Sequence, residues 1–257
     1  MKTDRQIKNP VSYRDRSYRA LAELSGLRET FVRVKETDLH ILSELDVTKS
    51  AGELALKFRL QVEHYIEVFP EFATSFMPLS DDKLAVPIIR DMMAAGRNAD
   101  VGPMAAVAGA LSEYVGKGLI DQGCKEIIIE NGGDIFLQRS RDCTIAVFAG
   151  QSPLSNRVGL QISSSRMPLG ICTSSGTVGH SMSLGSADSV TVLADSAIMA
   201  DAAATRLGNE VGNGNNKKDG INRALDVAGR FPDIHGALVI CGELLGAVGE
   251  VELVPLD

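Results

Sequence analysis

Residues 195–209, DSAIMADAAATRLGN, decide how this chain is interpreted. The run is dominated by Ala, with Met, Leu and Arg, and these residue types favour an α-helix. Asp201 and Thr205 are four residues apart, so a helix would place the carboxylate and the hydroxyl on one face. Two oxygen groups on a rigid helix can form half of the ligand shell of a hard cation such as Mg²⁺. The alternative is structural: an Asp that interacts with the helix dipole and a Thr that packs.

Two segments before this helix carry further polar groups. Residues 189–195, SVTVLAD, alternate β-branched and small residues and predict a strand. Residues 171–185, ICTSSGTVGHSMSLG, predict a loop that offers hydroxyls, backbone N–H groups and glycine freedom at positive φ. A loop, a strand and an Asp/Thr helix in direct succession indicate a site for phosphate and metal. An ordinary surface loop built from turn-forming residues is the alternative.

A tight turn follows a buried strand in residues 125–138, KEIIIENGGDIFLQ. The run of three Ile residues is typical of a strand that is buried on both faces. Asn-Gly-Gly at 131–133 is a typical turn sequence, so a simple hairpin is one interpretation. Glu130 and Asp134 flank the turn, and two close carboxylates are costly unless a cation or a hydrogen-bond donor stabilises them. The turn is therefore also a candidate part of the site.

A helix of small residues is predicted for residues 102–123, GPMAAVAGALSEYVGKGLIDQG. Pro103 suits the first helical turn, and the Ala and Gly residues allow another backbone to approach closely. The run is too short for a membrane span and is interrupted by Glu113 and Lys117. Either the helix packs closely against the sheet, or its N-terminus leaves room for a ligand phosphate.

These segments together resemble the ApbE-like superfamily, whose named members are FAD:protein FMN transferases. The resemblance rests on NGGD at 131–134, TSSG at 173–176, His180 and ADAAAT at 200–205, in the family's order and approximate spacing. The strings GPMAAVAG, ENGGDI, AGQSPLS, CTSSGTVGHS and ADAAAT are similar to a branch of uncharacterised proteins found in archaea and anaerobic bacteria. The resemblance covers roughly residues 30–253.

The resemblance implies an α+β fold of the ApbE type, with mixed sheets and packed helices in a single compact unit. The irregular order of the predicted strands and helices also favours α+β over a doubly wound sheet. We expect a polar N-terminal extension at 1–28 and one ApbE-like domain at 29–257.

The resemblance also implies a site. Asp201 and Thr205 would hold Mg²⁺, together with a backbone carbonyl near Ala105. The turn and the loop would hold the phosphate or ribose of a flavin or nucleotide-like ligand. The residues expected to bind this cofactor or ligand are Asn131, Gly132, Gly133, Asp134, Thr173, Ser174, Ser175, Gly176 and His180. No catalytic residue is assigned.

Two departures from the family pattern bear on function. The transferases carry a Lys in their small-residue helix, and Ala106 stands at that position here. They follow the loop His with Ile-Ile-Asp-Pro, whereas residues 181–184 are Ser-Met-Ser-Leu. Because fold does not fix function, we expect the Mg²⁺ and phosphate part of the site to be kept and FAD:protein FMN transfer to be weak or absent. FAD or FMN as a bound cofactor is left open.

Two classes of function remain. The first is a Mg²⁺-dependent enzyme of flavin or nucleotide phosphoryl transfer. The second is a non-transferase that binds a small anionic metabolite or, as the resemblance implies, assists sulfur assimilation in homocysteine formation. The changed Lys and Ile-Asp-Pro positions favour the second class or a changed substrate.

Composition predicts a soluble, enzyme-like domain with one large core or two closely joined lobes. The chain has 257 residues, of which 44% are hydrophobic, and a net charge of −7 without a basic block. This charge argues against nucleic acid and membranes as partners, and it leaves a homodimer open. The N-terminal residues contain no apolar segment, so we expect a cytoplasmic protein. The four scattered cysteines fit reduced thiols, and a nucleophilic or sulfur-carrying role is left open for Cys172.

The remaining segments predict scaffold. We expect a hairpin at 29–44 that turns at residues 37–38, helices at 51–69 and 87–97, a polar loop at 212–220 and a closing hairpin at 235–254. His40 and His64 are expected to cap or to face solvent.

Overall fold

The architecture is described from a computed structural model, which defines residues 26–176, 185–214 and 216–256. The strands are β1 (Arg28–Val34), β2 (Thr37–Ser43), β3 (Ile127–Asn131), β4 (Asp134–Gln138), β5 (Cys143–Ala146), β6 (Val158–Ile162), β7 (Leu169–Ser174), β8 (Ser189–Ala194), β9 (Gly236–Cys241), β10 (Leu244–Gly249) and β11 (Leu253–Pro255). The helices are α2 (Thr48–Val68), α3 (Glu71–Thr74), α4 (Pro87–Ala99), α5 (Val107–Asp121), α6 (Ala197–Val211) and α7 (Lys217–Ala228), with 3₁₀ turns η2 (Pro103–Ala106) and η3 (Ser164–Arg166).

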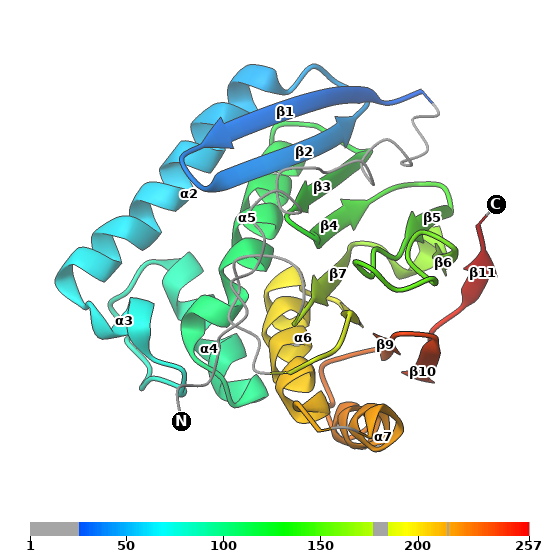
Figure 1. The fold of residues 1–257 in the computed structure, drawn as a ribbon. Coiled ribbons are helices and arrows are strands. Elements are labelled where there is room, and N and C mark those ends of the chain that lie inside the picture. The colour runs from blue at the N-terminus through cyan, green and yellow to red at the C-terminus, as the bar shows by residue number, and fades with distance from the viewer. Residues whose placement is uncertain (1–25, 177–184, 215, 257) are drawn as a thin grey trace.

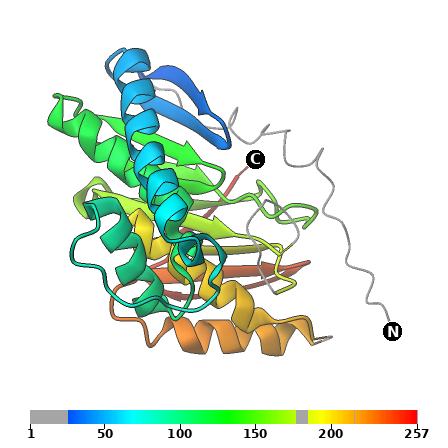
Figure 2. The ribbon, with the colours of Figure 1, turned by 90° about the vertical axis from the view of Figure 1, so that its left-hand side faces the viewer.

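The described residues form three layers (Figures 1 and 2). Eight strands form one sheet in the order β1-β2-β3-β4-β7-β8-β9-β10, and every neighbouring pair is antiparallel. Helices α2, α4, α5 and α6 cover one face, whereas β11, β6 and β5 form a smaller sheet on the other. This arrangement is an α+β fold in one compact unit, as the sequence predicted.

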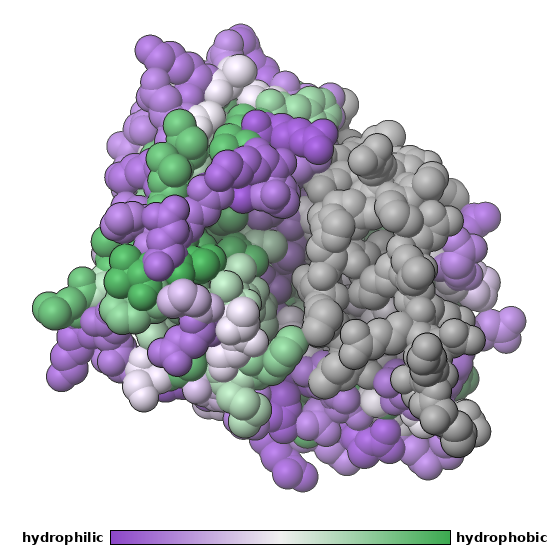
Figure 3. All heavy atoms as spheres, turned by 60° about the vertical axis from the view of Figure 1, so that its left-hand side comes forward, coloured by the Kyte–Doolittle hydropathy of each residue, from purple (hydrophilic) through white to green (hydrophobic). Residues whose placement is uncertain are grey.

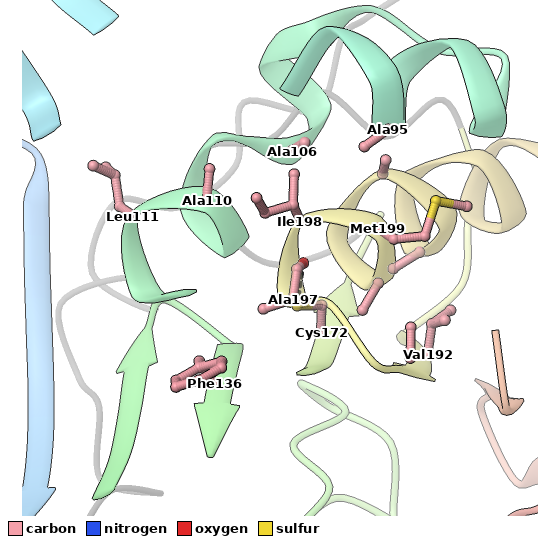
Figure 4. Packing of buried hydrophobic residues seen from close by; sticks show 14 of the residues in the cluster. Ala95, Ala106, Ala110, Leu111, Phe136, Cys172, Val192, Ala197, Ile198 and Met199 are labelled. Carbon is pink, nitrogen blue, oxygen red and sulfur yellow. Dashed lines mark hydrogen bonds between the residues drawn. The ribbon is translucent and has the colours of Figure 1, made fainter. Parts of the chain in front are cut away.

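Each boundary between layers contains its own hydrophobic core. Alternate residues of a strand point to opposite faces, so Ile127 and Ile129 of β3 pack under the helices and Ile128 packs toward the small sheet. In the core on the helix side, buried residues of α4, α5 and α6 pack against buried residues of the sheet (Figure 4). Burial on both faces explains why β3 is a continuous apolar run rather than an alternating one.

Most predicted elements are confirmed. The Asp/Thr segment forms α6, which begins after Ser196, whose hydroxyl accepts hydrogen bonds from the N–H groups of Ile198 and Met199. Helices α2 and α4 and strand β8 lie close to their predicted ranges, and Pro87 begins α4. The helix predicted at 102–123 is interrupted near its start, where the 3₁₀ turn η2 precedes α5.

Two predicted loops are partly wrong. The loop predicted at 171–185 begins as a strand, because residues up to Ser174 pair with β8 as part of β7. The loop predicted at 212–220 ends early, because the side chain of Asn216 accepts a hydrogen bond from the N–H of Asp219 and caps α7. In both places a local cap or a cross-strand partner overrides the turn-forming composition.

Both predicted hairpins form with changed details. The hairpin at 29–44 turns at residues 35–36 rather than 37–38. The closing hairpin consists of β9 and β10, whereas β11 leaves it and pairs with β6 in the small sheet. The C-terminal strand therefore joins the two sheets instead of extending the hairpin.

His40 and His64 differ in their exposure to solvent. His64 is exposed, as predicted. The prediction for His40 is wrong, because this residue is buried opposite Phe31 in the β1–β2 pair. Its ring stacks on Phe31 with 4.8 Å between the centroids, and its Nε2 lies 2.7 Å from Oε1 of Glu29.

Large hydrophobic side chains are exposed between the end of α2 and the start of α4. They are Val68, Phe69, Phe76, Met77, Leu84 and Val86. Figure 3 shows hydrophobic surface among polar surface on this side of the molecule. Within the described ranges, no helix is long and apolar enough to cross a membrane.

The first turn of α6 lies in direct contact with two neighbouring backbones. A Cβ atom added at Gly170 of β7 would lie 2.3 Å from the backbone nitrogen of Ala197. One added at Gly109 of α5 would lie 2.2 Å from the carbonyl oxygen of the same residue. Glycine is therefore needed at both positions, because only glycine permits such close backbone approach.

We predict that Gly170→Ala lowers the free energy of unfolding by about 1–3 kcal/mol, because the added methyl group overlaps the backbone of Ala197. Gly52→Ala in α2 is the matched control, since a Cβ there meets no atom within 4 Å. The control should stabilise the protein by roughly 0.5–1 kcal/mol. Urea unfolding followed by circular dichroism measures both changes. Equal stability of Gly170→Ala and the wild type would contradict the close contact.

Candidate functional site

The NGGD turn, the end of β7 and the start of α6 meet on the helix side of the sheet. Asp134 lies opposite Cys172 in the β4–β7 pair, and cross-strand partners point to the same face. The Cys172 thiol donates toward the carbonyl oxygen of Ala197 at 3.2 Å, and Figure 4 shows these two residues side by side. One turn further along α6, Asp201 lies close enough for its charge to act on Asp134.

The beginning of α5 holds the Asp201 carboxylate. Oδ2 of Asp201 accepts a hydrogen bond of 2.9 Å from the N–H of Gly109, and the N–H of Ala108 also donates to this carboxylate. In a regular 3₁₀-helix the N–H of Ala108 would donate to the carbonyl oxygen of Ala105, and in a regular α-helix the N–H of Gly109 would do so. Because Asp201 takes them, and because η2 packs against α6, the Ala105 carbonyl oxygen is a candidate ligand beside the carboxylate.

Asp134 and Asp201 are buried carboxylates with raised pKa values. Burial raises the pKa of Asp201 to about 7, and the hydrogen bonds from Gly109 and Ala108 oppose this rise. Burial is also the main cause that raises the pKa of Asp134, and the charge of Asp201 raises it further. In the described part of the chain, no Lys, Arg or His forms an ion pair with either carboxylate. The two groups are therefore protonated more readily than ordinary carboxylates, and a bound cation would favour their ionised forms.

Cys172 lacks the surroundings of a nucleophile. Its side chain is fully buried, and burial followed by the charges of Asp134 and Asp201 raises the pKa of the thiol well above its usual range. Only the thiolate is reactive, so a neutral buried thiol is inert. All four cysteines are free and buried, as reduced thiols require.

The TSSG segment divides between the two faces of the sheet. Oγ1 of Thr173 lies 2.9 Å from Oγ1 of Thr191, on the face away from α6. Ser174 shares the face of Cys172, and its Oγ is buried without a hydrogen-bond partner among the residues that the structure describes. An unpaired buried hydroxyl costs free energy. Ser174 is therefore the hydroxyl of this segment that a ligand at the site could satisfy.

The NGGD turn is a two-residue hairpin loop that is fixed to α5. Gly132 and Gly133 have φ angles of 70° and 109°, which hairpin turns of this length need and which favour glycine. Oε1 of Glu130 accepts a hydrogen bond of 2.7 Å from the N–H of Gly133. Nδ2 of Asn131 donates to the carbonyl of Ala108 at 3.1 Å. A backbone donor thus stabilises Glu130, while Asp134 remains on the side of Asp201.

The other predicted residues are Thr205, Ser175 and Gly176, which the structure describes, and His180, which it does not. Thr205 is half-buried, one helical turn after Asp201. Gly176 donates its N–H to the carbonyl of Ala187 at 2.9 Å, and Ser175 is half-buried next to it. His180 lies outside the described residues, together with the departure at 181–184.

Ala106, where the resembled transferases carry Lys, belongs to the hydrophobic core. Its side chain is fully buried, and Figure 4 shows it near Ile198 of α6. A lysine at this position would carry its ammonium group into a region lined by buried hydrophobic residues, which costs free energy unless the group is paired.

Sequence reasoning missed Glu113, which joins α5 to α6. Its side chain is only 3% exposed, and Oε2 accepts a hydrogen bond of 2.7 Å from the hydroxyl of Ser196 and one of 3.2 Å from the N–H of Ile198. Oε1 lies 2.6 Å from Nζ of Lys117. A charged residue in a run of small apolar residues is the signal that could have identified it.

Comparison with protein families decides the classification. A model of the family described as "AbpE bacteria" matches residues 21–249. The chain belongs to this family. A UPF0280 protein of Methanococcus maripaludis strain S2 is 46% identical over 233 residues, covering 88% of this chain and 92% of the relative. A UPF0280 protein of Methanocaldococcus jannaschii is 42% identical over 228 residues, covering 87% and 92%.

Solved structures of ApbE proteins share the fold of this family member. The flavin transferase ApbE from Vibrio cholerae gives a TM-score of 0.53 at 12% identity, covering 89% of this chain and 97% of that one. The flavinyl transferase ApbE from Pseudomonas stutzeri gives 0.54 at 10% identity, covering 87% and 94%. The resemblance to the ApbE-like superfamily, in a branch represented in archaea, is confirmed.

The raised pKa of Asp201 predicts a pH-dependent stability of the metal-free protein. Between about pH 4 and 7 the folded state binds more protons at this group than the unfolded state, so the free energy of unfolding falls as pH rises. Asp201→Asn removes this contribution. The stability of the variant relative to wild type should increase with pH by at most about 1.4 kcal/mol per unit, the value for one proton. Urea unfolding in chelator across this range measures it, and a flat difference would contradict the raised pKa.

Proposed function

We propose that the protein binds a phosphate-bearing small molecule, flavin-like or nucleotide-like, together with Mg²⁺ at the junction of η2, α5, α6 and the end of β7. The observation that carries this proposal is the pair of buried carboxylates, Asp134 and Asp201, without an ion-pair partner among the described residues. A buried charge is tolerated only when it is paired, protonated or bound to a metal.

The residues at this junction suit Mg²⁺ because they offer oxygen ligands. Asp201 would supply the charged oxygen, Thr205 a hydroxyl one turn on, and Ala105 a carbonyl whose usual amide donors are engaged by Asp201. Mg²⁺ prefers oxygen and commonly keeps several waters and substrate phosphates as ligands. Among the described residues, no three His, Cys, Asp or Glu side chains group as a metal cluster, so ligand oxygens would complete the shell. The ion would supply positive charge to the phosphate.

Ser174 and the glycine turn would complete the ligand site. The hydroxyl of Ser174 can donate to a phosphate or ribose oxygen, which would satisfy a buried group that has no hydrogen-bond partner among the described residues. Gly132 and Gly133 keep the turn free of side chains, so a ligand could approach the backbone of residues 131–134 closely.

Binding without FMN transfer to protein is the version of this function that we favour. The relevant observation is Ala106, which packs in the core at the position where the resembled transferases carry Lys. The flavin transferases share the fold at low sequence identity, which leaves the ligand open between a flavin and another anionic metabolite.

The metal pair can be tested by calorimetry with FAD, FMN, ADP and inorganic phosphate as probes, each with and without Mg²⁺. We expect Asp201→Asn to abolish Mg²⁺-dependent binding because the charged ligand is lost, and Thr205→Val to weaken it less. Asp195→Asn is the matched control, since this carboxylate is 85% exposed just before α6. Metal-independent and equal affinities in all four proteins would remove Asp201 and Thr205 from the site.

FMN transfer can be tested by mixing the protein with FAD, Mg²⁺ and a Ser/Thr acceptor protein and measuring covalent flavin fluorescence in a gel. We expect little or no transfer, with the Vibrio cholerae flavin transferase ApbE as positive control. Ala106→Lys should not create activity and should destabilise the protein by several kcal/mol, about the cost of burying an unpaired ammonium group. Robust transfer by the wild type would overturn the binding-only interpretation.

A further inference from the structure

Glu113 and Asp201 form a reciprocal connection between α5 and α6. Asp201 of α6 accepts a hydrogen bond from the N–H of Gly109 at the start of α5. Glu113, one turn along α5, accepts hydrogen bonds from Ser196 and from the N–H of Ile198 at the start of α6. Each helix therefore gives a carboxylate to the N-terminal amides of the other, where negative charge is stabilised by the helix dipole.

We propose that Glu113 is a positioning residue for the metal site, acting through α6. This inference rests on the proposed function for its consequence, although the contacts themselves do not. By accepting hydrogen bonds from Ser196 and Ile198, Glu113 fixes the position of the first turn of α6 relative to α5. Asp201 follows in the next turn, so its distance from Gly109 and from the carbonyl of Ala105 depends on that anchor.

The contacts of Glu113 distinguish this role from general charge pairing. Its carboxylate is 3% exposed, whereas its ion-pair partner Lys117 is 60% exposed. An exposed ammonium contributes little to stability or to geometry. The buried oxygen, Oε2, instead faces α6, where two donors converge on it. The structural contribution of Glu113 therefore lies in the connection to α6 and not in the pair with Lys117.

The experiment compares Glu113→Ala and Glu113→Gln with Lys117→Met, the matched control that removes only the exposed partner. Amide hydrogen exchange at Gly109, measured by NMR without metal, reports whether Asp201 stays in place. We expect protection of this amide to be lost in Glu113→Ala, partly kept in Glu113→Gln, whose amide oxygen can still accept one bond, and unchanged in Lys117→Met. Leu160→Ala, in the small sheet, controls for general loss of stability.

Mn²⁺ titration followed by electron paramagnetic resonance measures the consequence for the metal. We expect an affinity roughly tenfold weaker in Glu113→Gln than in wild type, the usual size of effect for a residue that orients a ligand, and no change in Lys117→Met or Leu160→Ala. Unchanged Gly109 protection in both Glu113 variants, or equal loss in Leu160→Ala, would overturn the positioning role. Absence of Mn²⁺ binding in the wild type would instead overturn the proposed metal site, and the exchange result would still decide the role of Glu113.

Discussion

The direct backbone contact of the first turn of α6 with α5 and β7 is the constraint on which the rest of the structure depends. Gly109 and Gly170 leave no side chain between these elements, so both lie against Ala197. Once the first turn is fixed there, Asp201 in the next turn has to lie at the amides that begin α5. A larger residue at Gly109 would push α6 away from α5, and one at Gly170 would push it away from β7. Either shift would move Asp201 away from its hydrogen-bond donors, and a buried carboxylate without donors is costly.

This packing places charge in a region that is otherwise apolar. Small residues surround Asp201 on α6, and the opposite wall is a sheet whose inward residues are mostly aliphatic. Two carboxylates in such surroundings reduce the stability of the protein, as does a hydroxyl, that of Ser174, without a hydrogen-bond partner among the described residues. Under the proposed function, a bound cation and ligand would recover that free energy, so part of the protein's stability would depend on binding.

The fold and the ligand are separate questions in this family. The two flavin transferases of the same fold described above are only 12% and 10% identical to this chain. Under the proposed function, Asp201 and the turn at 131–134 would supply the groups that bind metal and phosphate. Ala106 lies in the hydrophobic core.

The sequence by itself determined the type and order of most elements, because these depend on neighbours along the chain. The Ala-rich run fixed α6, three Ile residues fixed a doubly buried strand, and consecutive glycines fixed the turn at 132–133. These features also identified the family. Segments such as 217–220 escaped prediction because a single cap, at Asn216, outweighed a turn-forming composition.

Only the tertiary structure decided which groups face the site, because that depends on contacts between residues far apart in the sequence. The register of β4 with β7 sets Asp134 opposite Cys172. The pleat of β7 puts Ser174 on the face of Cys172 and Thr173 on the other, and a shift of one residue would exchange these faces. Likewise, the amides of α5 reach Asp201 across 92 residues of sequence. Periodicity within one helix cannot specify its rotation and translation against another, since packing of the two surfaces sets both.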